Sequence, residues 1–261
     1  MNRIEQKMAL LKEKKEKALI TYITAGLPDL EKTKALILAQ EEAGTDVIEL
    51  GIPFSDPVAD GPVIQRASYQ SICLGTNIRK VFQMMEEIRS DGVKMPIIFM
   101  LYYNTILHYG IKEFARKCKE AGVDGLIVPD LPFEEQEELQ NALDECDGAI
   151  LIQLVSPVSA ERIPVILKHA RGFVYCVSSM GVTGQAGTFH KEVLTYLKNV
   201  KEVSDIPVMM GFGIRSAKDI EPMKDIIDGV IVGSHLIQLL EEHDYSIETV
   251  KEYCRNFKQN L

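Results

Sequence analysis

Two carboxylates, Glu49 and Asp60, have the residue type and the surroundings that acid–base chemistry requires. Glu49 interrupts the apolar run 47–50, which has the composition of a buried strand, and Asp60 follows in a proline-containing loop. A buried glutamate is costly unless it is paired, hydrogen-bonded or protonated, and a protonated one is a general acid. The alternative is that Glu49 only anchors a neighbouring loop through hydrogen bonds, and this stretch alone favours neither interpretation.

Glycine-containing loops in the last third of the chain indicate a site for anion binding. The segments GVTG (181–184), GFG (211–213) and GS (233–234) each follow a predicted strand. Glycine lets the backbone approach a phosphate closely, and the first amides of the next helix point at the same place. Each glycine alone fits an ordinary turn, but three such loops in succession favour a substrate that carries a phosphate.

Apolar and aromatic residues near the predicted strand ends could line a pocket for a flat, apolar group. These residues are Tyr22, Met100, Tyr102, Ile127 and Tyr175, and all of them fall on predicted strands. The alternative is that they are ordinary core residues, because strand parity alone does not say which face they occupy.

An alternation of apolar runs and helical segments must position these residues. The runs do not alternate apolar with polar residues, so both of their faces should be covered, as in a parallel sheet with helices outside. The eight runs are 18–25, 46–51, 96–104, 125–131, 149–155, 173–179, 207–213 and 229–234. This pattern predicts an α/β fold, a single (β/α)8 TIM barrel. A doubly wound sheet is the alternative, although no Gly-rich dinucleotide turn follows the first run.

Three further features refine the predicted barrel. An amphipathic helix over 2–15, with Ile4, Met8 and Leu11 on one side, precedes the first strand and is expected to plug the closed end. The loops after strands 2 and 6 are enlarged, and the first of them includes a short helix over 63–73. Because loops after the strands form the catalytic face of such barrels, both should overhang one mouth. No linker divides the chain, which predicts one domain over 1–261.

Composition excludes several other classes of protein. The net charge of −9 argues against a nucleic-acid surface, and the longest apolar run is too short to span a membrane. The amino terminus lacks the apolar centre of a signal peptide. Five scattered cysteines indicate reduced thiols in a cytoplasmic protein, and neither cysteines nor histidines have metal-ligand spacing. We therefore expect no metal site, no nucleic-acid partner and no membrane partner.

Long segments of this sequence resemble the tryptophan synthase alpha chain family. The matching segments run from the first strand to the last: YITAGLPD (22–29), ELGIPFSDPVADGPVIQRA (49–67), GLIVPDLPFEE (125–135), SSMGVTG (178–184), GFGI (211–214) and VGS (232–234). The resemblance implies a lyase that cleaves indole-3-glycerol phosphate to indole and D-glyceraldehyde 3-phosphate by a retro-aldol route. No cofactor in this chain is implied.

The resemblance also assigns roles to individual residues. Glu49 would move a proton to indole C3 and take one from the glycerol hydroxyl, while Asp60 would accept the indole N–H and stabilise the positive ring. Thr183 would lie in a loop that closes over the substrate near Asp60. The residues that would bind the phosphate or flank the indole are Tyr22, Tyr102, Tyr175, Gly184, Phe212, Gly213, Gly233 and Ser234.

A partner is implied by the same resemblance. The family works as an alpha2beta2 heterotetramer with a pyridoxal-phosphate (PLP) beta subunit that receives the indole, and Pro53, Asp56 and Pro57 would face that partner. Two departures from the familiar pattern, at 179–180 and at His235, concern loop closure and phosphate affinity. The alternatives are a stand-alone indole-releasing lyase and a non-catalytic activator of the beta subunit.

Overall fold

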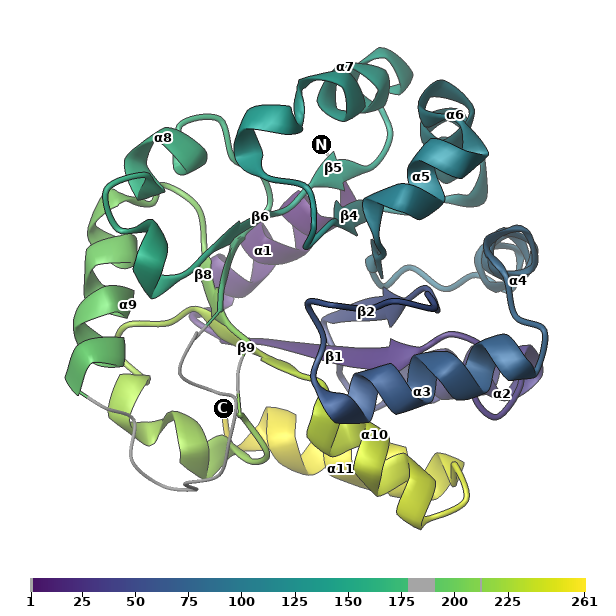
Figure 1. The fold of residues 1–261 in the computed structure, drawn as a ribbon. Helices are drawn as coiled ribbons and strands as arrows, with labels where there is room; N and C mark the ends of the chain where they lie inside the picture. The colour runs from purple at the N-terminus through teal and green to yellow at the C-terminus, as the bar shows by residue number, and fades with distance from the viewer. Residues whose placement is uncertain (1, 178–190, 212) are drawn as a thin grey trace.

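Parallel strands curve around one axis in the computed structural model, which describes residues 2–177, 191–211 and 213–261 (Figure 1). In these ranges the sheet has 9 strands in the order β5-β4-β3-β2-β1-β9-β8-β7-β6. Their bounds are β1 Ala18–Thr24, β2 Val47–Gly51, β3 Ile97–Met100, β4 Gly125–Ile127, β5 Ile150–Leu151, β6 Gln153–Val155, β7 Val174–Cys176, β8 Val208–Met210 and β9 Gly229–Val232. Only Ile152 separates β5 from β6 along the chain, so the two ends of the sheet meet and the barrel closes.

The predicted (β/α)8 TIM barrel is confirmed, with its fifth strand divided in two. The run 149–155 forms both β5 and β6, and each half pairs with a different neighbour. Several other strands are shorter than predicted; for example, β3 ends at Met100, β4 ends at Ile127 and β8 ends at Met210. The apolar residues that follow, such as Leu101 and Val128, are buried in the outer core layer without lying in a strand. Composition therefore did not mark where these strands end.

Helices surround the barrel, as Figure 1 shows. They are α1 Arg3–Lys14, α2 Leu30–Glu42, α3 Pro62–Cys73, α4 Ile78–Ser90, α5 Tyr103–Tyr109, α6 Ile111–Ala121, α7 Glu137–Cys146, α8 Ile163–Leu167, α9 Lys191–Val203, α10 Ser234–Glu242 and α11 Ile247–Gln259, with short 3-10 helices η1 Phe133–Glu135, η2 Pro157–Ser159 and η3 Ala217–Met223. The helix predicted over 63–73 is α3. Of the predicted long loop after the sixth strand, residues 178–190 lie outside the described ranges.

The barrel interior is apolar and is closed at one end by α1, as predicted. Ile4, Met8 and Leu11 of this helix join one buried cluster with residues from the strands, including Ile20, Val47, Ile98, Ile127 and Met209. Glycine makes room for the helix at two places. A Cβ atom at Gly125 would lie 2.8 Å from Cδ1 of Ile4, and one at Gly172 would lie 3.1 Å from Cγ2 of Ile4.

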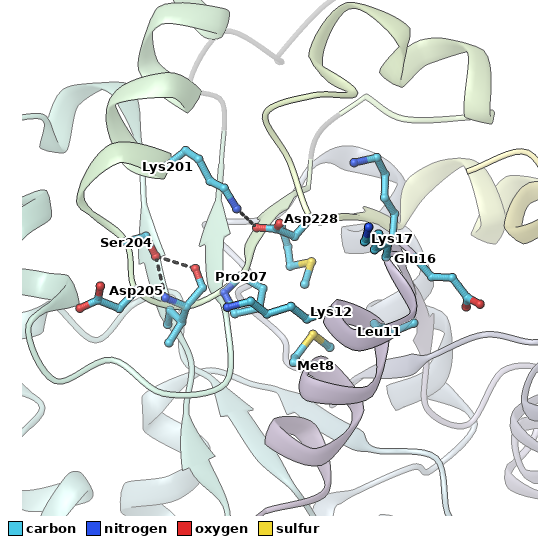
Figure 2. Close-up of a pocket in the computed structure, with 13 residues that line it drawn as sticks. Met8, Leu11, Lys12, Glu16, Lys17, Lys201, Ser204, Asp205, Pro207 and Asp228 are labelled. Carbon is cyan, nitrogen blue, oxygen red and sulfur yellow. Dashed lines mark hydrogen bonds and ion pairs between the residues drawn. The ribbon is translucent and has the colours of Figure 1, made fainter.

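A cavity of about 310 Å3 opens at this same closed end, between α1 and the segments that precede β8 and β9 (Figure 2). Its lining is Met8, Leu11, Lys12, Lys15, Glu16, Lys17, Lys201, Ser204, Asp205, Ile206, Pro207, Met209 and Asp228. Charges of both signs line it, and Lys201 is paired with Asp228 at 2.5 Å. It lies at the amino ends of the strands, so it is not the mouth towards which Glu49 and the glycine loops are directed.

Substitution of Gly229 by alanine should destabilise the barrel. The added Cβ would lie 2.6 Å from the Ala18 carbonyl oxygen and 2.6 Å from Met209 Sδ, and the backbone atom cannot move aside. Overpacking of this kind costs about 1–3 kcal/mol, measured as the free energy of unfolding in denaturant. Gly61→Ala is the control, because no atom in the described ranges lies within 4 Å of its added Cβ. Equal stabilities of the two variants would contradict this packing.

Candidate active site

Glu49 points into the barrel at the end opposite α1. Val47, on the same face of β2, belongs to the interior cluster, whereas Ile48 and Leu50 belong to the layer between strands and helices. Because side chains alternate along a strand, Glu49 shares the interior face with Val47. It pairs in register with Tyr22 of β1 and is only 1% exposed.

Burial controls the protonation of Glu49. Its Oε2 atom has no hydrogen-bond partner among the described residues. Desolvation, with a smaller contribution from the charge of Asp60, raises the pKa of Glu49 to about 8. The side chain is therefore protonated at neutral pH, which is one of the states that the sequence allowed for a glutamate in a buried strand.

Asp60 is held at the same mouth by Tyr102. The Tyr102 hydroxyl donates to Oδ2 of Asp60 at 3.0 Å and accepts the backbone N–H of Ala59 at 2.9 Å. Burial raises the pKa of Asp60 to about 6, and the Tyr102 hydrogen bond opposes this rise. Asp60 is thus mostly ionised at the pH at which Glu49 is mostly protonated. Two carboxyl groups whose pKa values are separated in this way can act as acid and as charge stabiliser.

Tyr102 does not lie on a strand, which corrects the sequence-based expectation. It follows β3 and is the residue before the first turn of α5. The ring of Phe54 stacks on the ring of Tyr102 with centroids 5.0 Å apart. Phe54 is in turn fixed by Ser68, whose hydroxyl accepts its N–H at 2.7 Å and donates to its carbonyl at 2.9 Å. The sequence analysis did not single out Phe54 or Ser68, although Phe54 lies within the matching segment 49–67 and Ser68 directly follows it.

Tyr22 and Tyr175 lie on strands β1 and β7, as predicted, and each ring occupies space left by a glycine. A Cβ atom at Gly51 would lie 2.0 Å from the Tyr22 hydroxyl oxygen, and one at Gly211 would lie 2.3 Å from Cε1 of Tyr175. Burial and then the charges of Glu49 and Asp60 raise the pKa of Tyr175. Burial and then Asp60 raise the pKa of Tyr22. Both tyrosines therefore share the mouth with the two acids.

The described glycine positions also lie on this side of the barrel. Gly213 has φ +66°, and no atom of the described residues lies within 4 Å of a Cβ atom built on it. Gly233 precedes α10, which begins at Ser234, and a Cβ at Gly233 would be 3.6 Å from the Tyr22 Cβ. The first amides of α10 thus begin beside Tyr22. Thr183, Gly184 and Phe212 lie outside the described residues.

The remaining predicted positions lie in the loop between β2 and α3. Pro57 is buried, Pro53 is half-buried, and Asp56 is exposed and accepts a hydrogen bond from Ser55 at 2.6 Å. Val58, next to them, is 82% exposed. In the described part of the chain no cluster of His, Cys, Asp or Glu could hold a metal ion. No helix there is long and apolar enough to cross a membrane.

A parallel (β/α)8 barrel whose mouth holds a protonated glutamate and an ionised aspartate defines an enzyme of carboxylate acid–base chemistry. Comparisons with known proteins identify its family. The family model described as "Tryptophan synthase alpha chain" matches residues 8–261. The tryptophan synthase alpha chain of Lachnospira eligens is 58% identical over 262 residues, which cover 100% of this chain and 99% of the relative. That of Alkaliphilus metalliredigens is 44% identical and covers 97% and 96%.

Solved structures agree with this assignment. Tryptophan synthase subunit alpha from Legionella pneumophila superposes with a TM-score of 0.90 at 36% identity, covering 100% of this chain and 98% of the other. Tryptophan synthase from M. tuberculosis in its aminoacrylate-bound form gives 0.87 at 33% identity, covering 100% of both chains. The chain therefore belongs to the tryptophan synthase alpha chain family and is an indole-3-glycerol-phosphate lyase of tryptophan biosynthesis. The resemblance drawn from the motifs is confirmed.

Removal of the Tyr102 hydroxyl should raise the pKa of Asp60. The hydrogen bond stabilises the ionised carboxylate, so Tyr102→Phe moves the pKa upward from about 6. In the pH profile of kcat/KM for indole release, the acidic limb should move to higher pH, because less Asp60 is ionised at a given pH. Tyr103→Phe is the control, since the hydroxyl bonded to Asp60 belongs to its neighbour. If the acidic limb of the Tyr102→Phe profile stays in place, the ionisation of Asp60 does not determine that limb.

Proposed function

We propose that Glu49 is the proton-transfer group of the lyase and that Asp60 stabilises the charge that develops on the indole ring. Glu49 donates its proton to indole C3, and the ring becomes cationic. It then removes the proton from the hydroxyl on the glycerol carbon bonded to C3. As the aldehyde forms, the carbon–carbon bond breaks and its electron pair returns to the ring, which gives indole and D-glyceraldehyde 3-phosphate.

The observation that carries this proposal is the protonated, buried state of Glu49. Carbon C3 of an indole is a weak base, so the donor must hold its proton at neutral pH and still be able to release it. A pKa raised to about 8 by burial meets both requirements. A glutamate with its ordinary pKa would already have lost the proton.

Asp60 complements this step with a fixed negative charge. Its carboxylate is held by Tyr102, which leaves acceptor capacity for the indole N–H. A charge positioned before the reaction stabilises the cationic intermediate without reorganisation. The raised pKa values of Tyr22 and Tyr175 keep both hydroxyls neutral, so their rings can flank the indole without adding charge.

The phosphate is placed at the other side of the mouth. We assign it to the backbone amides of Gly213, Gly233 and Ser234, where α10 begins. By the family resemblance, Gly184 and Phe212 would also bind the phosphate, and the loop that carries Thr183 would close over the substrate. The proposed site thus holds a flat apolar group near the acids and an anion near the glycines.

Glu49→Gln should abolish most activity and preserve the fold. The amide has nearly the same shape and is neutral like the protonated acid, but it cannot transfer the proton. We expect indole release to fall about 100- to 10,000-fold, measured as kcat with saturating indole-3-glycerol phosphate. Asp60→Asn should cause a smaller loss, because the amide oxygen still accepts the N–H. Near wild-type turnover of Glu49→Gln would remove Glu49 from the mechanism.

We further propose that the chain works in an alpha2beta2 heterotetramer with a PLP-dependent tryptophan synthase beta subunit, which receives the indole. The loop between β2 and α3 carries Asp60 at one end and the exposed Asp56 and Val58 in its middle. A partner that contacts this loop would act directly on the position of an acid. This chain itself needs no cofactor, and its free cysteines support a cytoplasmic location.

Mixing the purified chain with a beta subunit should distinguish the complex from the stand-alone lyase. We expect low indole release from the chain alone and a large acceleration in the mixture, since a bound partner orders the loop next to Asp60. High activity of the chain alone, unchanged by mixing, would support the stand-alone enzyme. No indole release in either sample, together with activation of the beta subunit, would support the non-catalytic activator.

A further inference from the structure

One side chain of α11, that of Tyr253, connects two separate loops at the mouth of the barrel. Its hydroxyl donates to the carbonyl oxygen of Arg215 at 2.8 Å, in the loop between β8 and η3. Its ring lies against the ring of His235, in the first turn of α10, with centroids 5.7 Å apart. Gly213 belongs to the first loop, and Ser234 directly precedes His235. The same tyrosine therefore contacts a residue two positions after Gly213 and the residue directly after Ser234.

Tyr253 is itself well fixed. Its ring meets the ring of Phe257, one turn further along α11, edge to face at 5.8 Å. Phe257 is buried, at 4% exposure. The loop that Tyr253 contacts is also fixed at its far end, because Asp219 accepts the N–H groups of Arg215 and Ser216 at 2.8 Å each. The Arg215 carbonyl is thus held from two sides.

A phosphate bound by backbone amides from two loops depends on the distance between those loops. Hydrogen bonds to the anion weaken steeply when donors move by a few tenths of an ångström or tilt. Among the described residues, no atom lies within 4 Å of a Cβ built at Gly213, so none of their side chains packs against the loop at that point. The contact of Tyr253 with the Arg215 carbonyl fixes the loop from outside, in addition to its bonds to Asp219.

We propose that Tyr253 is a positioning residue for the phosphate site, holding the β8 loop by its hydroxyl and the start of α10 by its ring. The inference rests on the proposed assignment of the phosphate to Gly213, Gly233 and Ser234. Tyr253 does not touch the substrate. The ring of Tyr253 packs against the imidazole of His235, and this contact positions the first turn of α10.

The surroundings of His235 fit this role. Burial, and then the positive charge of Arg215, lowers the pKa of His235, while Glu242 and Asp219 oppose that change. The imidazole is therefore neutral at physiological pH and packs against Tyr253 as an aromatic ring. The departure from the family pattern at His235 thus has a packing explanation.

The test is the affinity of Tyr253→Phe for sn-glycerol 3-phosphate, measured by calorimetry, together with its steady-state kinetics. Loss of the hydroxyl should raise the dissociation constant about three- to tenfold, as expected for one net hydrogen bond. The KM for indole-3-glycerol phosphate should rise by the same factor, and kcat should change less than twofold. Tyr109→Phe is the matched control, because that ring packs against Phe82 and Phe114 and neither phosphate loop. It should leave both constants unchanged.

A second pair of variants tests the ring contact independently. His235→Ala should weaken glycerol phosphate binding, and His235→Phe should restore it, because phenylalanine preserves the aromatic surface. If His235 bound the phosphate through a ring nitrogen, phenylalanine would not restore binding, and the proposed role of His235 would be wrong. This comparison remains informative even if Tyr253→Phe folds poorly.

The outcomes separate this inference from the proposed function. Wild-type affinity in Tyr253→Phe would overturn the positioning role while leaving the lyase mechanism intact. A wild-type chain that binds glycerol phosphate but releases no indole would refute the mechanism, and the comparison of variants would still decide the role of Tyr253. Absence of glycerol phosphate binding by the wild type would overturn this inference together with its phosphate site.

Discussion

The site depends on one constraint, which is that a carboxyl group is removed from water inside an apolar barrel. Glu49 shares its face of β2 with Val47, and one of its oxygens has no hydrogen-bond partner among the described residues. In such surroundings the ionised form is unfavourable, so the group keeps its proton at neutral pH. The apolar lining, the closed end and the inward direction of Glu49 all serve to maintain this protonated state.

Asp60, the second acid, is instead kept in its ionised form. Asp60 comes from a loop, and a tyrosine hydroxyl compensates for part of its lost hydration. Tyr102 is positioned by a stacked ring, Phe54, which is bonded to Ser68 of α3. The charged state of Asp60 thus depends on contacts among three segments of chain, whereas the neutral state of Glu49 depends on the strand to which it belongs.

This difference explains what the sequence could predict. The position of Glu49 follows from a carboxylate within an apolar run, and the barrel follows from eight such runs, because both are local patterns. The contact between Tyr102 and Asp60 joins residues 42 positions apart, and no local pattern contains it. The apolar character of the chain continues past Met100, so Tyr102 was placed on a strand although it directly precedes helix α5. The space that Gly51 leaves for Tyr22 depends on strand register and was likewise not predictable.

The plug formed by α1 has a consequence for the order in which the chain can fold during synthesis. Ile4 fits between Gly125 and Gly172, and Asn2 donates to the Asp124 carbonyl at 2.8 Å. Helix α1 leaves the ribosome before the strands that bury it, and its binding surface is incomplete until Gly172 and Met209 have been made. At ordinary translation rates this delay is on the order of ten to thirty seconds. Ile4, Met8 and Leu11 cannot reach their final contacts before then, so α1 is buried later than its position in the chain suggests.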